Sequence, residues 1–289
     1  IGSLSIIVLK FRQADSMVSI EYVQTWGVQG RSEVWVGEQS GKTQDRGEVV
    51  PATDCVVECA SVAPKGNEKY VALTFDEGPS GATKQILQVL KEKGVTATFF
   101  LSGDATEASP ATAKAIADAG CEIGSNSYSD DSLKGEDRET VRKQITKGTE
   151  AIKSATGVET MLLRAPYAAF DEQNWIDSMD LVSAVVSWNI DSGDWLLNGA
   201  DEQVSTVLDS VTPGNIVLLT DRDECAEQTL EALPQIIDGL IADGYKIVTL
   251  SDLVKTDTSL SKKLTSLTKV TMPKNAVFPQ LAEDDDATE

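Results

Sequence analysis

Short apolar runs alternate with longer amphipathic segments from about residue 69 to residue 256. The run 71–75 is typical of a buried strand. The segment after it carries apolar residues at Ile86, Leu87 and Leu90, which is the spacing of a helix with one buried face. This strand–helix alternation recurs along the whole segment. It predicts an α/β fold with a parallel sheet, closed or nearly closed as a distorted (β/α) barrel of seven to eight parallel strands.

Turn and cap residues place the predicted elements. Strands are expected at 71–75, 95–101, 122–124, 161–163, 182–188, 216–219 and 246–250. Helices are expected at 83–93, 110–120, 136–156, 171–179, 201–211 and 226–242, with Asp201 capping the fifth and Ser251 capping a last short helix. An open, doubly wound sheet is the alternative, but no glycine-rich phosphate-binding fingerprint follows the first strand.

The pattern divides the chain into three parts. Residues 1–66 form a small β-containing extension, whose segments 19–23 and 33–37 alternate as strands do and whose segment 40–51 resembles a linker. Residues 67–258 form the barrel domain. Residues 259–289 form a C-terminal extension that ends in an acidic tail at 282–289.

The apolar start of the chain leaves two interpretations open. Its apolar run is far shorter than the roughly 20 residues that span a bilayer, so it could be the cut end of a membrane anchor or signal segment, or a first strand. We expect a monomer outside the cell or at its surface, with membrane contact only through an anchor that precedes this chain.

The charge balance excludes some partners. The chain has 46 acidic and 25 basic residues, for a net charge of −21, which repels nucleic acid and anionic lipid headgroups. It has no histidine, so any acid/base chemistry must depend on carboxylates. Four cysteines are too few for a disulfide scaffold: Cys55 and Cys59 could pair locally, and Cys121 and Cys225 are expected to be buried free thiols.

Polar side chains follow several of the predicted strands. The carboxyl ends of parallel barrel strands meet on one face, so these residues are expected to form a cleft for a polar ligand. They are Asp76, Glu77, the segment 125–130, Arg164, Tyr167, the segment 189–195, Thr220 and Asp221.

Three of these clusters resemble the motifs of the polysaccharide deacetylases, carbohydrate esterase family 4, whose domain is called the NodB homology domain. The motif Thr-Phe-Asp-Asp-Gly-Pro is matched at 74–79, with Glu77 in place of the second Asp. The motif Arg-x-Pro-Tyr is matched by Arg164, Pro166 and Tyr167, and the motif Asp-x-x-Asp-Trp by Asp191, Asp194 and Trp195. The match covers about two thirds of the chain, from about 69 to 256, in the family's order.

The resemblance implies a metal-dependent hydrolase that removes acetyl groups from chitin-like or peptidoglycan glycans. It assigns the base to Asp76, the orientation of that base to Arg164, and the tuning of a histidine acid to Asp194. Tyr167, Trp195, Leu218 and Pro166 fall at substrate-binding positions. The metal ligands would be Glu77, Asn126 and Asp130, where the family has an Asp and two histidines, and Thr220 stands where the acid histidine belongs.

These replacements lead to three hypotheses. The first is a catalytically impaired homologue that keeps a glycan- or partner-binding cleft. Its activity is impaired because threonine cannot act as the acid, and it has no cofactor because the two metal-binding histidines are replaced. The second is an active deacetylase with an all-oxygen metal site for Mg²⁺, Mn²⁺ or Ca²⁺ rather than Zn²⁺, or with Asp221 as acid. The third is a structural scaffold in which Arg164 bridges Asp76 and Asp194.

Overall fold

The computed structural model describes residues 62–170, 172–178, 181–182 and 184–257. It also gives the strands β1 (Ile6–Ala14), β2 (Met17–Val23), β3 (Val36–Gln39), β4 (Val56–Val57) and β5 (Cys59–Ala60). The predicted linker at 40–51, the acidic tail at 282–289 and Cys55 lie outside the described residues. The boundaries of the three predicted parts therefore stay predictions.

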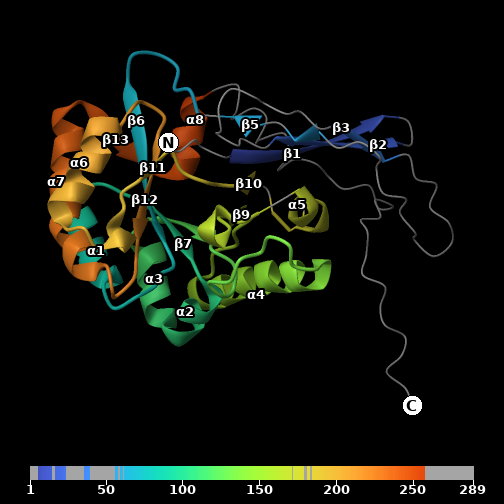
Figure 1. Cartoon of the computed structure of the whole chain (residues 1–289), viewed down its shortest axis with the longest axis horizontal. Helices are drawn as coiled ribbons and strands as arrows, with labels where there is room; N and C mark the ends of the chain where they lie inside the picture. Colours follow the sequence, from blue (N-terminus) through green and yellow to red (C-terminus); the bar gives the residue numbers. More distant parts are fainter. Residues whose placement is uncertain are drawn as a thin grey trace.

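One curled sheet of eight parallel strands forms the centre of the molecule (Figure 1). Its order is β10 (Ala184–Val185), β9 (Leu162–Leu163), β8 (Glu122–Ser125), β7 (Thr98–Leu101), β6 (Lys69–Asp76), β12 (Ile216–Thr220) and β11 (Ile190–Asp191), and β13 (Tyr245–Val248) also pairs with β6. The two ends of this path, β10 and β11, are joined directly by the chain at 186–189. The predicted distorted (β/α) barrel is confirmed.

Helices surround the sheet on its outer side. They are α1 (Thr83–Lys93), α2 (Gly103–Ala108), α3 (Pro110–Asp118), α4 (Arg138–Thr156), α5 (Glu172–Ser178), α6 (Ala200–Ser210), α7 (Ala226–Ala242) and α8 (Leu250–Thr256). Figure 1 shows α1, α6 and α7 grouped on one flank, and α2, α3 and α4 on another. Each helix follows a strand or connects two strands, which is the connection that parallel pairing requires.

The central strand β6 shows how the alternation of side chains builds two cores. Its residues Val71, Leu73 and Phe75 belong to the core shared with α1 and α7, whereas Ala72 belongs to a second core with Phe100. Successive side chains of a strand point to opposite faces, so Thr74 and Asp76 lie on the same face as Ala72. The Asp76 side chain therefore points into the interior of the barrel.

Several predicted element ends were wrong. Helix α6 begins at Ala200 after Gly199, and Asp201 lies inside its first turn rather than at its cap. The N-cap of α8 is Thr249, whose side chain accepts a hydrogen bond from the backbone N–H of Asp252, and not Ser251. Helix α2 was missed because its six residues are too few to show a helical period.

The N-terminal strands form a second, five-stranded sheet, in which β1 pairs antiparallel with β2 and β5. The start of the chain at Ile6–Ala14 is thus a strand, one of the two interpretations left open. Cys121 and Cys225 are free thiols, as expected, but only Cys225 is buried, and Cys121 is partly exposed. Among the described residues, no helix has the length and apolarity needed to cross a membrane.

Candidate functional site

Asp76 and Arg164 form a buried ion pair inside the barrel. Asp76 is the last residue of β6, and Arg164 follows β9 directly. Nη1 of Arg164 lies 2.7 Å from Oδ1 of Asp76, and the Arg164 side chain is 1% exposed. The predicted contact between the base position and its orienting arginine is therefore confirmed.

The protein surrounds the Arg164 guanidinium with acceptors and rings. Nη1 also donates to the hydroxyl of Thr74, Nε donates to the Val186 carbonyl and Nη2 to the Ser187 carbonyl, at 2.7–3.1 Å. The rings of Phe100 and Trp188 lie 4.2 and 5.6 Å from the guanidinium carbon. A buried arginine is tolerated only when its donors are matched in this way.

Burial decides the protonation behaviour of Asp76. Loss of solvation raises the pKa of Asp76 to about 6, although the charge of Arg164 acts to lower it. A carboxylate with a pKa of about 6 can accept a proton near neutral pH, which is the property of a general base. This pKa is compatible with the base role that the resemblance assigns to Asp76.

The third hypothesis placed Arg164 between Asp76 and Asp194, and this placement was wrong. Oδ2 of Asp194 accepts hydrogen bonds from the backbone N–H of Thr220 at 2.7 Å and from the Thr229 hydroxyl at 3.1 Å. Its Oδ1 accepts from the Thr220 hydroxyl at 2.8 Å. The residue at the acid position therefore ties Asp194 to β12 and carries no group that transfers a proton near neutral pH.

Glu77 lies at a sharp turn directly after β6. Its φ of 71° is in the left-handed region, which costs free energy for a residue with a Cβ. Its N–H donates to the Phe100 carbonyl at 3.1 Å, and its carbonyl accepts from the Ser102 hydroxyl at 2.9 Å. These two hydrogen bonds fix the backbone of the turn and with it the direction in which the Glu77 side chain leaves the backbone.

The Glu77 carboxylate is paired with an arginine that was not among the predicted site residues. Nη1 of Arg222 lies 2.9 Å from Oε2 of Glu77. Burial, with the nearby charge of Asp130, raises the pKa of Glu77 to about 7 despite this arginine. Arg222 has no counterpart in the family motifs, and the only sequence signal for it was its position two residues after Thr220 at the end of a strand.

Asn126 and Asp130 lie in the loop after β8, and the charge of Asp130 acts on Glu77. Nδ2 of Asn126 donates to the Arg164 carbonyl at 2.7 Å, and this residue is buried. Oδ2 of Asp130 accepts a 2.6 Å hydrogen bond from the Tyr167 hydroxyl. Helix α4 comes very close to this loop, because a Cβ at Gly148 would lie only 2.5 Å from the Ser127 carbonyl oxygen.

The three positions equivalent to family metal ligands do not fit a divalent ion. Glu77 is paired with Arg222, and Asn126 offers at most one amide oxygen. No group of three His, Cys, Asp or Glu residues in the described part of the chain could hold a metal ion. A guanidinium at 2.9 Å from the Glu77 carboxylate repels a divalent cation bound to the same carboxylate.

Two aromatic side chains stand exposed at the rim of this site. Tyr167 is 67% exposed and Trp195 is 54% exposed, and both are held by carboxylates. Nε1 of Trp195 donates to Oδ1 of Asp191 at 3.1 Å, and the hydrogen bond to Asp130 raises the pKa of Tyr167 to about 12. Pro166 and Leu218, the other predicted substrate-binding residues, are buried.

Asp221, the alternative acid of the second hypothesis, is buried and held by two hydroxyl groups. It is 1% exposed, and its two oxygens accept 2.6 Å hydrogen bonds from the hydroxyls of Ser80 and Thr83. A Cβ at Gly78 would lie 2.2 Å from its Oδ2, so the loop after Glu77 packs tightly against it. Asp221 therefore fastens this loop to β12.

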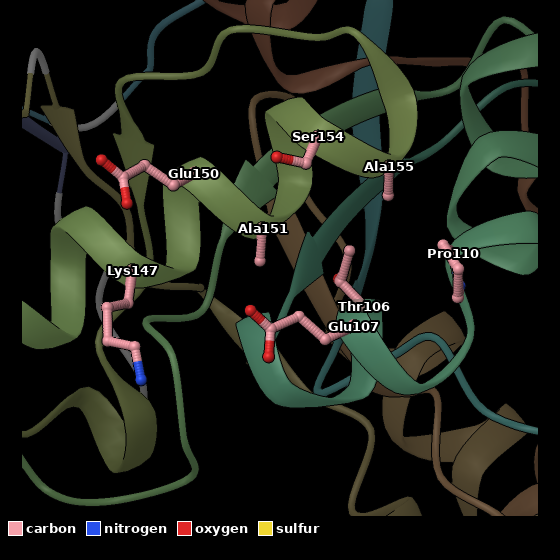
Figure 2. Close-up of a pocket in the computed structure, with 8 residues that line it drawn as sticks. All are labelled: Thr106, Glu107, Pro110, Lys147, Glu150, Ala151, Ser154 and Ala155. Carbon is pink, nitrogen blue, oxygen red and sulfur yellow. The ribbon is translucent and has the colours of Figure 1, made fainter.

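A separate hollow of about 320 Å³ lies on the outer side of the barrel. Figure 2 shows its lining, which comes from α2 and the start of α3 on one side and from α4 on the other. Glu107, Lys147 and Glu150 bring charge to it, and Ala151 and Ala155 bring apolar surface. It shares no residue with the strand-end site.

The fold and the site together define a NodB-type barrel of the carbohydrate esterase class, with a buried Asp–Arg ion pair inside and exposed aromatic residues near it. The family model "Polysaccharide deacetylase" matches residues 63–181. A peptidoglycan-N-acetylglucosamine deacetylase from Bacillus cereus is 32% identical over 219 residues, covering 74% of this chain and 79% of the relative. The chain belongs to the polysaccharide deacetylase family, carbohydrate esterase family 4.

Other relatives match a smaller part of their own length. A bifunctional xylanase/deacetylase from Pseudobutyrivibrio xylanivorans is 36% identical over 189 residues, covering 65% of this chain but 31% of the relative. This chain thus spans about a third of that bifunctional relative.

A solved structure adds a relevant comparison. A carbohydrate esterase family 4 pseudoenzyme from Bacillus anthracis superposes with a TM-score of 0.61 at 30% identity, covering 67% of this chain and 69% of that one. A mutant of the same pseudoenzyme has restored enzymatic activity and superposes with the same TM-score, 0.61. The family therefore includes proteins whose barrel is kept while activity is lost.

Proposed function

We propose that this protein binds acetylated glycan at its strand-end site without hydrolysing it. The single observation that carries this proposal is the hydrogen bond from the Thr220 hydroxyl to Asp194. At the position that the resemblance assigns to the general acid, the chain has a group that holds a neighbouring residue and cannot protonate a leaving amine.

The proposed loss of hydrolysis has further support at the metal positions. Glu77 is neutralised by Arg222, and the Asn126 amide is bound to the Arg164 carbonyl. Without an electrophile at the acetyl carbonyl and without an acid for the leaving group, Asp76 has no activated water to deprotonate. Each of these deficits alone typically costs roughly 10²-fold or more in rate.

The proposed binding rests on the two exposed aromatic residues. Large exposed aromatic side chains that are fixed by hydrogen bonds offer flat apolar faces at low entropic cost, which is how proteins hold the faces of sugar rings. Tyr167 and Trp195 meet this description, each held by a carboxylate. The relatives named above include a peptidoglycan deacetylase, so we propose peptidoglycan or chitin-like oligomers as ligands and the cell surface as the place of action.

Two measurements on the purified chain test the proposal. Calorimetric titration with chitotetraose and with a peptidoglycan disaccharide should show saturable binding to at least one of them. Acetate release from the same compounds should stay at background, with or without added Mn²⁺, Mg²⁺ or Zn²⁺. Metal-dependent acetate release would instead establish the active all-oxygen enzyme, and absence of binding to every glycan would refute the binding role.

A further inference from the structure

The guanidinium of Arg222 occupies the middle of the acidic part of the site. It lies in the loop between β12 and α7, with Nη1 2.9 Å from Glu77 and Nε 3.5 Å from Glu224. The charge of Asp130 also acts on it, and the charge of Arg222 in turn reaches Tyr167. Residues that follow β6 and β12 thus contact this cation directly, and Asp130, after β8, is close enough for its charge to act on it.

The position of Arg222 is fixed by its surroundings. Asp221, its neighbour, is buried and held by Ser80 and Thr83, and the backbone N–H of Asp221 donates to the Asp76 carbonyl at 2.8 Å. The side chain of Arg222 is 43% exposed, so its charge faces the open side of the site. The backbone at the base of this side chain is held in place, and its tip is paired with Glu77.

We propose that Arg222 is a built-in cation that replaces a divalent metal ion at Glu77 and Asp130. It neutralises these carboxylates as a metal would, but a guanidinium is not deprotonated in proteins and cannot bind and ionise a water molecule. The inference deepens the proposed function, on whose inactive site it rests. Arg222 thus closes the site to metal, in addition to the absence of histidines.

The experiment is a two-by-two comparison of zinc affinity by calorimetry. One factor is the ligand pair, which is either natural or N126H/D130H. The other factor is position 222, which is either arginine or R222M, a substitution that keeps an unbranched apolar stem and removes the charge. We expect N126H/D130H/R222M to bind Zn²⁺ at least about tenfold more tightly than N126H/D130H, since the competing charge is gone. Equal affinity, within about twofold, would overturn the proposal.

Three controls keep the result specific. K91M removes an exposed positive charge in the last turn of α1, outside the strand-end site, and should not change zinc affinity in the N126H/D130H background. Adding E77Q to N126H/D130H/R222M should abolish the gain, which separates this site from zinc bound elsewhere on an acidic surface. A gain that K91M reproduces or that E77Q leaves intact would count against Arg222.

If the histidine variants do not fold, as judged by near-ultraviolet circular dichroism, the same comparison is made with Asn126 and Asp130 unchanged. Binding of Mn²⁺, followed by electron paramagnetic resonance, should then be at least about tenfold tighter in R222M than in the unmodified chain. Equal Mn²⁺ affinity would overturn the proposal. Glycan binding and acetate release do not enter these measurements, so failure of the proposed function and failure of this inference are distinguishable.

Discussion

Nη1 of Arg164 lies 2.7 Å from Oδ1 of Asp76 in the interior of the barrel. The same guanidinium also contacts Thr74, two backbone carbonyls and the ring of Phe100. The pair crosses from the end of β9 to the end of β6, strands that are separated by β8 and β7 in the sheet. It therefore links the two sides of the curled sheet as well as orienting the base position.

Replacing Arg164 by methionine should strongly destabilise the protein. The change leaves Asp76 buried without its counter-ion, and breaking a buried pair in this way typically costs about 3–5 kcal/mol. Urea unfolding followed by circular dichroism measures the loss. The double variant R164M/D76L should recover a large part of it, because no uncompensated charge remains, and a double variant as unstable as R164M would show that the pair is not the cause.

Stability should rise as the pH is lowered from 8 to about 5. Burial raises the pKa of Asp76 to about 6 and that of Glu77 to about 7, and it also raises the pKa of Asp194 and of Asp221. The folded state therefore binds these protons more tightly than the unfolded chain. The resulting stabilisation is complete below the unfolded values near 4 and is lost as the pH rises through about 6 to 7.

This pH profile is unusually easy to assign because the chain has no histidine. Thermal unfolding between pH 4.5 and pH 8 measures it at constant ionic strength. The variant E77Q should flatten the upper part of the profile, since it removes the group with the pKa of about 7. A melting temperature that falls steadily from pH 8 to pH 5 would contradict the expectation.

The hydroxyl of Thr220 should act in stability and not in catalysis. T220V removes its hydrogen bond to the buried Asp194 carboxylate, and a bond to a charged group typically contributes about 1.5–3 kcal/mol. Denaturant unfolding should show a loss of this size, whereas T220S, which keeps the hydroxyl, should lose less. Acetate release should be at background in all three proteins, and a hydrolytic activity that depends on Thr220 would contradict this role.

The rim aromatics should contribute to glycan affinity with little effect on stability. Trp195→Ala and Tyr167→Ala remove exposed faces, so each should weaken chitotetraose binding by at least about tenfold, the loss expected when one well-placed aromatic contact is removed. Ile241 on α7 is 47% exposed and serves as a matched control, because I241A removes an exposed apolar side chain away from the site. Equal affinity in W195A, Y167A and I241A would exclude the rim as the binding surface.

The sequence predicted the architecture because its signals are local. The apolar run of β6, the helical spacing of α1 and the glycine after it are all readable within about twenty residues, and the pattern recurs with little change. Helix caps were less well predicted, as Thr249 and Gly199 show, since a cap depends on which backbone groups the fold leaves unpaired. The six-residue α2 gave no period to read.

The sequence by itself determined the barrel and the strand-end positions of Asp76, Arg164, Tyr167 and Trp195, because alternation along a strand and position at its end do not depend on distant residues. Only the tertiary structure decided how the charges are paired. Asp194 is held by Thr220 and not by Arg164, and Glu77 is held by Arg222. These partners are separated by 26 residues in the first case and by far more in the second, and only the packing of strands from distant parts of the chain brings them together.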